Sequence, residues 1–259
     1  MRRRSLSASP EEPIVLDRIL NNNTWRAIAY VAESPGFGEL TDSQIEETYG
    51  WKIGDTKDIT IMAGRVDTCE FEGGVYKAMI LGFNHNRSIE GQGIQFAIIS
   101  DTMPYIMRYV RMNPLKSNVG GWEDCRMRTV YLQQFKLLLP NSLRCAIKKT
   151  VKYTDNMGGI GEELEENVTA TEEDIFLMSE FEYFGRITKS NSYEQYKQAR
   201  YKYLTEYSVL GSDNRCFRSP ASPVLGKNGE FCNVSWNMED AGTLDATRDD
   251  LYIIPCFRV

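Results

Sequence analysis

The sequence contains a single histidine, His85, and no long hydrophobic run. One histidine excludes a metal site built mainly from imidazoles, unless carboxylates complete the ligand set. No segment approaches the roughly 18 apolar residues of a membrane span. The three arginines near the start are not followed by the apolar core of a signal peptide. We therefore expect a protein made in the cytoplasm without a signal peptide and with no membrane contact.

Common catalytic motifs are also missing. The chain has no G-x-x-x-x-G-K-[ST] phosphate loop and no G-x-S-x-G nucleophile elbow. Its six cysteines include no C-x-x-C pair, so we expect reduced, buried thiols rather than a zinc site. Cys125 and Cys216 lie beside arginines, which is only a weak indication of an activated thiol. The sequence predicts no catalytic centre, no cofactor and no bound metal.

Positive charge is in deficit, with a net charge of −6 and a pI near 5.1. Nucleic acids and anionic membranes repel an acidic protein, so we expect neither as a partner. The acidic run Glu162–Glu166 and the pair Asp249–Asp250 lack the spacing of an EF-hand, and we interpret them as solvated loops. His85 has no nucleophile beside it, and we interpret it as a turn residue that bonds to backbone.

Hydrophobic periodicity predicts an α+β fold with antiparallel sheets and helices. Apolar residues recur at the spacing of one helix face, with Asn23 as the expected N-cap: Trp25, Ile28, Ala29 and Ala32. A second helical piece is expected over Ser43–Tyr49. Glycine turns separate three expected strands, Lys57–Met62, Val75–Phe83 and Ile94–Ile99. Asp101 is then expected to cap another helix.

The second half mixes helical and strand patterns. We expect a helical stretch over Met127–Leu138, an exposed loop over 155–170 and a strand over Ile175–Met178. A helical turn over Glu180–Phe184 and one helix over Ser192–Tyr207 follow. Phe231–Trp236 and Leu251–Val259 read as strands, and Pro255 places the last one at an edge or bulge.

The expected organisation has three parts. Residues 1–13 are rich in Ser and Pro and predict a flexible N-terminal arm. Residues 14–113 form an N-terminal α+β part with antiparallel strands. Residues 114–259 form a second part that we expect to make one compact unit with the first.

Five segments occur in the order of a known family: Trp51–Thr56, Gly82–Asn86, Gly120–Arg128, Asp174–Phe184, and Cys216–Pro220 with the closing Ile254–Val259. The last three contain G-G-W-E-D-C-R-M-R, F-L-M-S-E-F-E and C-F-R-S-P. The chain thereby resembles the domain of unknown function numbered 6273, found in bacteria and phages, over about residues 20–259. Cys125 stands where that family usually has Ser, and Ile254 replaces an Arg of the closing motif.

The R-S-P segment and closing strand are also similar to C-type-lectin-like folds. These include formylglycine-generating enzymes, phage tropism determinants and the variable proteins of diversity-generating elements. The resemblance implies a C-type-lectin-like C-terminal half that displays loops between residues 211 and 250. Trp236 can equally be a core residue. The implied ligand-binding residues are Asp213, Asn214, Arg215, Ser222, Asn228, Trp236, Asn237, Glu239 and Asp240.

The motif residues also suit a structural polar network. Trp122 supplies a large apolar surface. Three arginines can bond to backbone carbonyls or to buried carboxylates such as Glu180: Arg126, Arg128 and Arg218.

We therefore expect a non-enzymatic binding or structural module, a phage or bacterial particle component that displays a receptor-binding surface. Its expected partners are other virion or assembly proteins, further copies of itself in a homo-oligomer, and a host surface protein or glycan. The expected location is the surface of the particle. A cytosolic ligand-binding or regulatory domain is the second hypothesis. A formylglycine-generating-type enzyme that uses Cys216 or Cys232 is the third.

Overall fold

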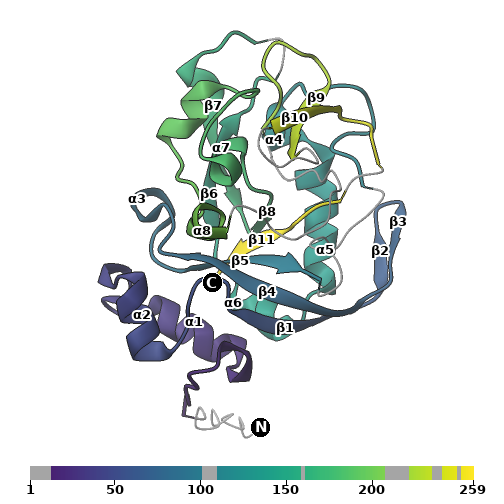
Figure 1. The fold of residues 1–259 in the computed structure, drawn as a ribbon. Helices are drawn as coiled ribbons and strands as arrows, with labels where there is room; N and C mark the ends of the chain where they lie inside the picture. The colour runs from purple at the N-terminus through teal and green to yellow at the C-terminus, as the bar shows by residue number, and fades with distance from the viewer. Residues whose placement is uncertain (1–12, 101–109, 159–160, 208–221, 235–240, 250–251) are drawn as a thin grey trace, which may run out of the picture.

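The computed structural model describes residues 13–100, 110–158, 161–207, 222–234, 241–249 and 252–259 (Figure 1). The helix expected to begin at Asp101 lies outside these residues. The described part combines helices with antiparallel sheets, which confirms the α+β class. None of the described helices has the length and hydropathy that a bilayer span requires.

A five-stranded antiparallel sheet of order β1-β4-β5-β11-β8 lies at the centre of the molecule. The strands β1 (Thr56–Ile61), β4 (Gly74–Phe83) and β5 (Ile94–Ile99) confirm the three predicted in the N-terminal part. The other two, β8 (Ile175–Phe176) and β11 (Cys256–Arg258), come from the C-terminal part. The two parts of the chain thus share one sheet and one hydrophobic core.

The final strand was predicted to lie at an edge or to contain a bulge, and the edge position was wrong because the strand is interior. β11 pairs with β5 on one side and β8 on the other. Pro255 is tolerated because it precedes β11, where no ladder N–H is required of it. Its carbonyl accepts a hydrogen bond from the Ile98 amide at 2.9 Å, which aligns the strand for pairing.

Two short helices follow the N-terminal residues. The 3-10 turn η1 (Leu20–Asn22) precedes α1 (Trp25–Glu33), and η2 (Phe37–Glu39) precedes α2 (Asp42–Tyr49). Thr24, not Asn23, caps α1, since its side chain accepts the Ala27 amide at 3.1 Å. Asn23 instead donates to the carbonyl of Asp17 at 2.9 Å, and so fixes the turn that leads into the helix.

Helix α1 packs on the sheet through an aromatic cluster. The Trp25 ring lies edge-on to Phe96 and Phe257, with ring centroids 5.5 and 5.8 Å apart. Because Phe96 belongs to β5 and Phe257 to β11, this cluster joins the first helix to the last strand. Rings in this geometry add stability beyond the apolar area that they bury.

The remaining elements surround the sheet. After the small hairpin β2 (Gly64–Val66) and β3 (Cys69–Phe71) come α3 (Arg87–Glu90) and α4 (Gly121–Asp124). A single π-helical segment, η3 (Met127–Tyr131), continues into α5 (Leu132–Leu138) and is followed by α6 (Asn141–Ala146). Next are β6 (Thr150–Asp155), η4 (Glu165–Asn167), β7 (Val168–Glu173), α7 (Glu180–Phe184), η5 (Ser192–Tyr196), α8 (Lys202–Tyr207), β9 (Glu230–Val234) and β10 (Ala241–Asp245).

Two of these elements differ from expectation. The loop predicted over 155–170 is narrower, because Asp155 ends β6 and residues from Val168 onward form β7, the two strands pairing as an antiparallel hairpin. The single helix predicted over Ser192–Tyr207 is two helices, η5 and α8. The interruption is set by tertiary contacts: the Gln198 side chain donates to the Tyr153 carbonyl, and the Tyr201 amide donates to the Glu182 carbonyl at 3.0 Å.

Candidate functional site

The most concentrated chemistry in the described residues is a buried ionic cluster around Lys152, which we call the Lys152 cluster. Lys152 projects from β6, Glu90 from the end of α3 and Glu182 from α7. The Lys152 Nζ lies 2.6 Å from Glu182 Oε1 and 2.9 Å from Glu90 Oε1. His85 completes the cluster, with Nε2 at 3.4 Å from the same Glu182 oxygen. The lysine therefore ties two helices to a strand.

The Lys152 cluster is withdrawn from solvent, since none of its four side chains is more than 3% exposed. Burial acts to lower the pKa of Lys152, but the charges of Glu182 and Glu90 outweigh it and raise the pKa. Burial acts to raise the pKa of Glu182, but Lys152 and His85 bring it down from 4.5 to about 2. The pair is therefore held in its charged form.

Aromatic rings surround the charges. The Lys152 Nζ lies 4.1 Å from the centroid of Phe176, a cation–π contact. The His85 ring stacks on Tyr201 at 3.8 Å between centroids. Burial, followed by the nearby carboxylates, raises the pKa of the Tyr201 hydroxyl well above 10.0. His85 lies in a turn, as predicted, but it is buried and its ring contacts the Glu182 carboxylate instead of backbone.

His85, Glu90 and Glu182 also have the donor types of a metal site, with their ligand atoms within 4.8 Å of one another. The donor set does not fit a divalent ion in this arrangement. The Lys152 ammonium already lies between the two carboxylates and supplies the positive charge that a metal would bring. A metal could enter only if Lys152 left, so these residues act as a structural brace.

A second buried acidic group, the Glu194 cluster, lies where the C-terminal strands begin. Glu194 accepts the Asp155 amide at 2.9 Å and the Ser222 hydroxyl at 2.5 Å. The Ser222 hydroxyl in turn accepts the amide of Glu180 at 3.2 Å. Glu180 receives its own donors from the amides and hydroxyls of Thr188 and Ser190. Three segments distant in sequence are joined through one serine.

The hydrogen-bond donors of the Glu194 cluster named above are neutral amides and hydroxyls. Burial raises the pKa of Glu194 from 4.5 to about 8, against the hydrogen bonds from Ser222 and Asp155 and with the help of the charge on Glu180. Glu194 therefore carries a proton near neutral pH. The Cys232 thiol lies 3.6 Å from Glu180, and burial with the nearby carboxylates raises its pKa well above 9.0. Such a thiol is a poor nucleophile.

The arginines of the predicted network bind carboxylates other than Glu180. Arg126 forks onto Asp67 at 2.7 and 2.9 Å, and Arg128 donates to Glu173 at 2.6 Å. Trp122, fully buried, donates its indole N–H to the same Glu173 oxygen at 3.1 Å. Glu180 is unavailable to them because the backbone around 188–190 already encloses it. Arg218 lies outside the described residues.

The predicted ligand-binding residues divide into three groups. Ser222 is fully buried and belongs to the Glu194 cluster. Asn228 is exposed in the turn between Gly226 and Gly229. The others lie outside the described residues: Asp213, Asn214, Arg215, Trp236, Asn237, Glu239 and Asp240.

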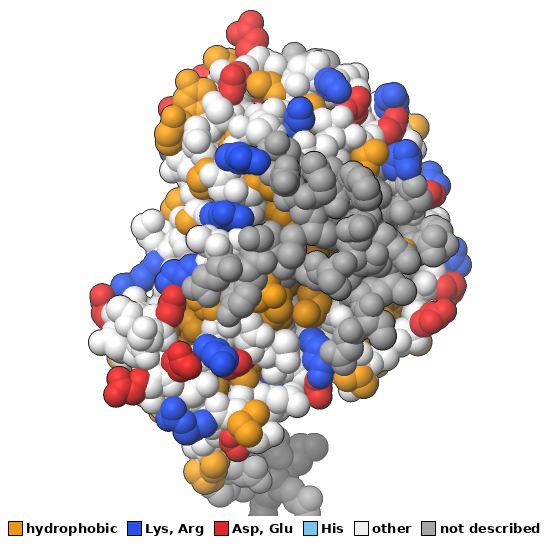
Figure 2. Space-filling view, viewed as in Figure 1, with side chains coloured by type: hydrophobic (Ala, Val, Ile, Leu, Met, Phe, Trp, Pro, Cys, Tyr) orange, Lys and Arg blue, Asp and Glu red, His pale blue; other side chains and the backbone are white. Residues whose placement is uncertain are grey.

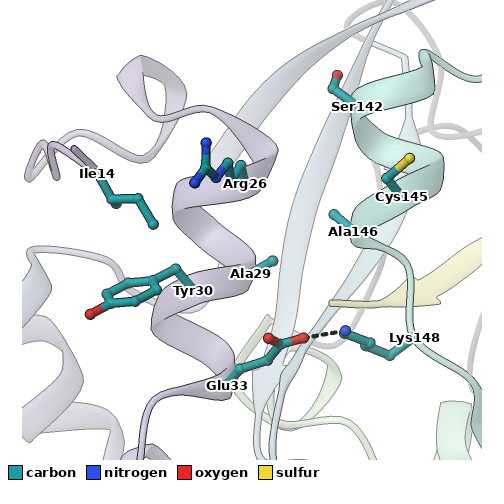
Figure 3. Close-up of a pocket in the computed structure, with 9 residues that line it drawn as sticks. All are labelled: Ile14, Arg26, Ala29, Tyr30, Glu33, Ser142, Cys145, Ala146 and Lys148. Atoms are coloured by element: carbon teal, nitrogen blue, oxygen red, sulfur yellow. Dashed lines mark ion pairs between the residues drawn. The ribbon is translucent and has the colours of Figure 1, made fainter. Parts of the chain in front are cut away.

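A surface cavity of about 630 Å³ lies between α1 and α6, and we call it the α1–α6 groove (Figure 3). Arg26, Tyr30 and Glu33 line it from α1, and Cys145 lines it from α6. Glu33 forms an ion pair with Lys148 at one end. Sequence reasoning missed this groove, since none of its residues belongs to a recognised motif. The polar residues on the outer face of α1 were the only sequence feature that could have indicated the groove.

Neither the Lys152 cluster nor the Glu194 cluster was predicted, although Glu180 was expected to be a buried carboxylate. Glu90, Lys152 and Glu194 are isolated charges in sequence, and only the fold brings them to buried positions. Comparison with protein-family models, with curated proteins and with solved structures finds no match for this chain.

Proposed function

We propose that this chain is a non-enzymatic binding module, in which a scaffold braced by buried charges holds recognition loops. The C-type-lectin-like character of its C-terminal half and its place on a phage or bacterial particle are part of the same proposal. The observation that carries it is that the described residues bordering two segments, 208–221 and 235–240, belong to one hydrogen-bonded frame. Together these contain seven of the nine residues expected to bind ligand.

Both segments end in one hydrogen-bonded frame. Segment 208–221 leads into Ser222, whose carbonyl accepts the Cys232 amide at 3.0 Å. Segment 235–240 connects β9 to β10, where Val234 is paired with Ala241. Cys232 and Val234 lie two residues apart on β9, so Ser222, which follows the first segment, and Val234, which precedes the second, lie near each other.

The Glu194 cluster makes this frame rigid. Ser222, at the base of segment 208–221, is held by Glu194 and by the amide of Glu180. Recognition surfaces bind more tightly when their supports are ordered before the ligand arrives, because less conformational entropy is lost on binding. The buried carboxylates thus serve the loops as supports, and the raised pKa of Cys232 fits the same structural role.

The character of the surface favours a protein or glycan partner. Figure 2 shows basic and acidic side chains interleaved over one face, with hydrophobic side chains gathered toward its middle. A face of mixed charge suits a host surface protein, a glycan or a neighbouring virion protein better than it suits the uniform negative charge of nucleic acid. A homo-oligomer would multiply weak contacts of this kind.

Binding to an array of bacterial surface polysaccharides and purified surface proteins tests the proposal. Trp236→Ala should weaken capture at least about tenfold and leave the melting temperature unchanged, as expected for an aromatic anchor. The matched control is Tyr30→Ala, because Tyr30 is 57% exposed and lies on α1, at the other end of the molecule from β9 and β10 (Figure 1). Equal losses in both variants, a lowered melting temperature for Trp236→Ala, or conversion of the captured ligand to a product would contradict the proposal.

The second candidate function is a cytosolic ligand-binding or regulatory domain. The α1–α6 groove favours it, since the groove has the volume of a small-molecule site and lies away from β9 and β10 (Figure 1). A gene neighbourhood of metabolic genes, rather than tail or capsid genes, would support this alternative.

A further inference from the structure

The Lys152 cluster holds an amine and a carboxylate in direct contact, away from water. The Lys152 Nζ lies 2.6 Å from Glu182 Oε1, and the two side chains are 3% and 0% exposed. Such a pair carries the free-energy cost of removing both charges from water. An amide between the same two groups has no net charge, so burial favours the amide over the ions. The surroundings of this pair therefore favour its condensation.

The ion pair already contains the atoms that condensation releases. An ammonium and a carboxylate become an amide by losing one oxygen and two hydrogens as water, so the reaction needs no oxidant, nucleotide or cofactor. The fold keeps the two groups in contact, which replaces an encounter between separate molecules and lowers the barrier. Exclusion of water also removes the reactant of the reverse hydrolysis.

Glu90 is placed to move the protons of this reaction. Its Oε1 lies 2.9 Å from the Lys152 Nζ. Its Oε2 accepts the Thr150 hydroxyl at 2.6 Å, which fixes the orientation of the carboxylate. Oxygens of Glu90 and Glu182 lie within 4.8 Å of each other. Glu90 can therefore take a proton from the nitrogen and return it to the oxygen that departs.

Two further groups face the carboxyl group of Glu182, one at each oxygen. The backbone amide of Ser179 donates to Oε2 at 2.9 Å, and His85 Nε2 lies 3.4 Å from Oε1. The Ser179 amide stabilises the negative charge that Oε2 gains when an amine adds to the carboxyl carbon. In the tautomer with a proton on Nε2, His85 donates to Oε1 and so assists its departure.

From these contacts we infer that Lys152 and Glu182 condense to an amide, a covalent link between β6 and α7 that forms inside the folded chain. One ammonium proton passes to Glu182 Oε1, and the neutral amine adds to Cδ to form the C–N bond. The nitrogen gives a second proton to Glu90, which returns it to Oε1. The Cδ–Oε1 bond then breaks and releases water, while Oε2 remains as the amide oxygen.

The link changes an ionic brace into a covalent one. It joins residues that lie 30 apart in sequence. Until the amide forms, the pair keeps the charges described above. The reaction is a single condensation within one chain rather than turnover of a substrate, and it does not depend on the proposed function.

Mass spectrometry of the full chain detects the link. After incubation of the native protein at neutral pH, more than about half of it should be lighter than the sequence by about 18 Da, one water. In this form trypsin should not cut after Lys152, and a digest should contain the Lys152 peptide joined to Glu182. Lys136 and Asp174 are the internal control, because they also lie 2.6 Å apart but are 26% and 19% exposed, and their peptides should stay separate.

Three variants separate the roles of the residues. Glu90→Gln keeps an oxygen that accepts from Lys152 but cannot carry the proton, so the lighter form should appear at least about tenfold more slowly. Lys152→Met removes the amine and should keep the full sequence mass. Lys136→Met is the matched control and should form the link at the native rate. Melting temperatures show whether each variant is folded, and the native measurement decides if Glu90→Gln is not.

Three results would overturn the inference. The first is a native chain that keeps the full sequence mass after prolonged incubation. The second is a loss of water that maps to residues other than Lys152 and Glu182, including a link from Lys152 to Glu90. The third is a folded Glu90→Gln variant that forms the link at the native rate, which would remove the proposed path of the protons.

Discussion

The Lys152 Nζ lies 2.6 Å from Glu182 Oε1, with both side chains enclosed in the core. Glu90 shares the same ammonium at 2.9 Å. Removal of Lys152 therefore leaves two carboxylates buried without their cation, which costs more free energy than the loss of an exposed ion pair.

We predict that Lys152→Met lowers the free energy of unfolding by about 3–5 kcal/mol. Urea denaturation measures this value. Lys202→Met is the control, because Lys202 pairs with Asp42 at the surface and should contribute less than about 1 kcal/mol. Adding Glu90→Gln and Glu182→Gln to Lys152→Met should restore part of the loss. Equal effects of the two lysine variants would count against the buried brace.

Glu194 makes stability fall as pH rises. Its pKa is raised from 4.5 to about 8 in the folded protein, so between these values the folded state binds more protons than the unfolded state. The contribution of Glu194 to stability should be fully present below pH 4.5 and should be lost as pH rises to 8, by an amount on the order of 5 kcal/mol. Thermal unfolding over this range measures the slope.

Glu194→Gln removes the titration. Its oxygen can still accept the Asp155 amide and its NH2 group can donate to the Ser222 hydroxyl, so its melting temperature should depend less on pH between 4.5 and 8. Glu165→Gln, an exposed change on η4, should keep the native slope. Glu182 affects stability in a different pH range. Its pKa is lowered to about 2 in the folded protein, so its contribution to stability is lost as pH falls from 4.5 toward 2. An unchanged slope in Glu194→Gln would disprove the assignment.

The two arginines of the G-G-W-E-D-C-R-M-R segment should differ in importance. Arg128 binds Glu173, whose side chain is 1% exposed, whereas Arg126 binds Asp67, whose side chain is 16% exposed. We predict that Arg128→Met costs about 3 kcal/mol of stability, and Arg126→Met about 1 kcal/mol, because water can replace the lost partner only at Asp67. Chemical denaturation of both variants checks the order, and the reverse order would refute it.

Ser222 and Asn228 were both expected to contact ligand, but they should respond differently to substitution. Ser222→Ala removes the hydroxyl between Glu194 and Glu180, so we predict a loss of about 2 kcal/mol in stability. Asn228→Ala changes an exposed turn residue and should stay within about 0.5 kcal/mol of the native protein. Calorimetry of the pair measures both, and a neutral Ser222→Ala would exclude the anchoring role.

Much of the secondary structure was predictable because it depends on local patterns. The alternation in β1, β4 and β5 and the apolar face of α1 each follow from residues close in sequence. The position of β11 could not be predicted from local patterns, because a proline in a strand usually indicates an edge. Only the pairing of β11 with both β5 and β8 shows that Pro255 precedes the paired residues. The interruption between η5 and α8 was likewise set by contacts with Tyr153 and Glu182.

The sequence by itself determined the α+β class, two helices and three strands of the N-terminal part, and the absence of common nucleotide-binding and hydrolase motifs. Only the tertiary structure decided which charges are buried together. Lys152 lies 62 residues from Glu90 and 30 from Glu182, and Ser222 lies 28 from Glu194. Pattern reasoning compares neighbours along the chain, whereas burial and charge pairing depend on neighbours in space.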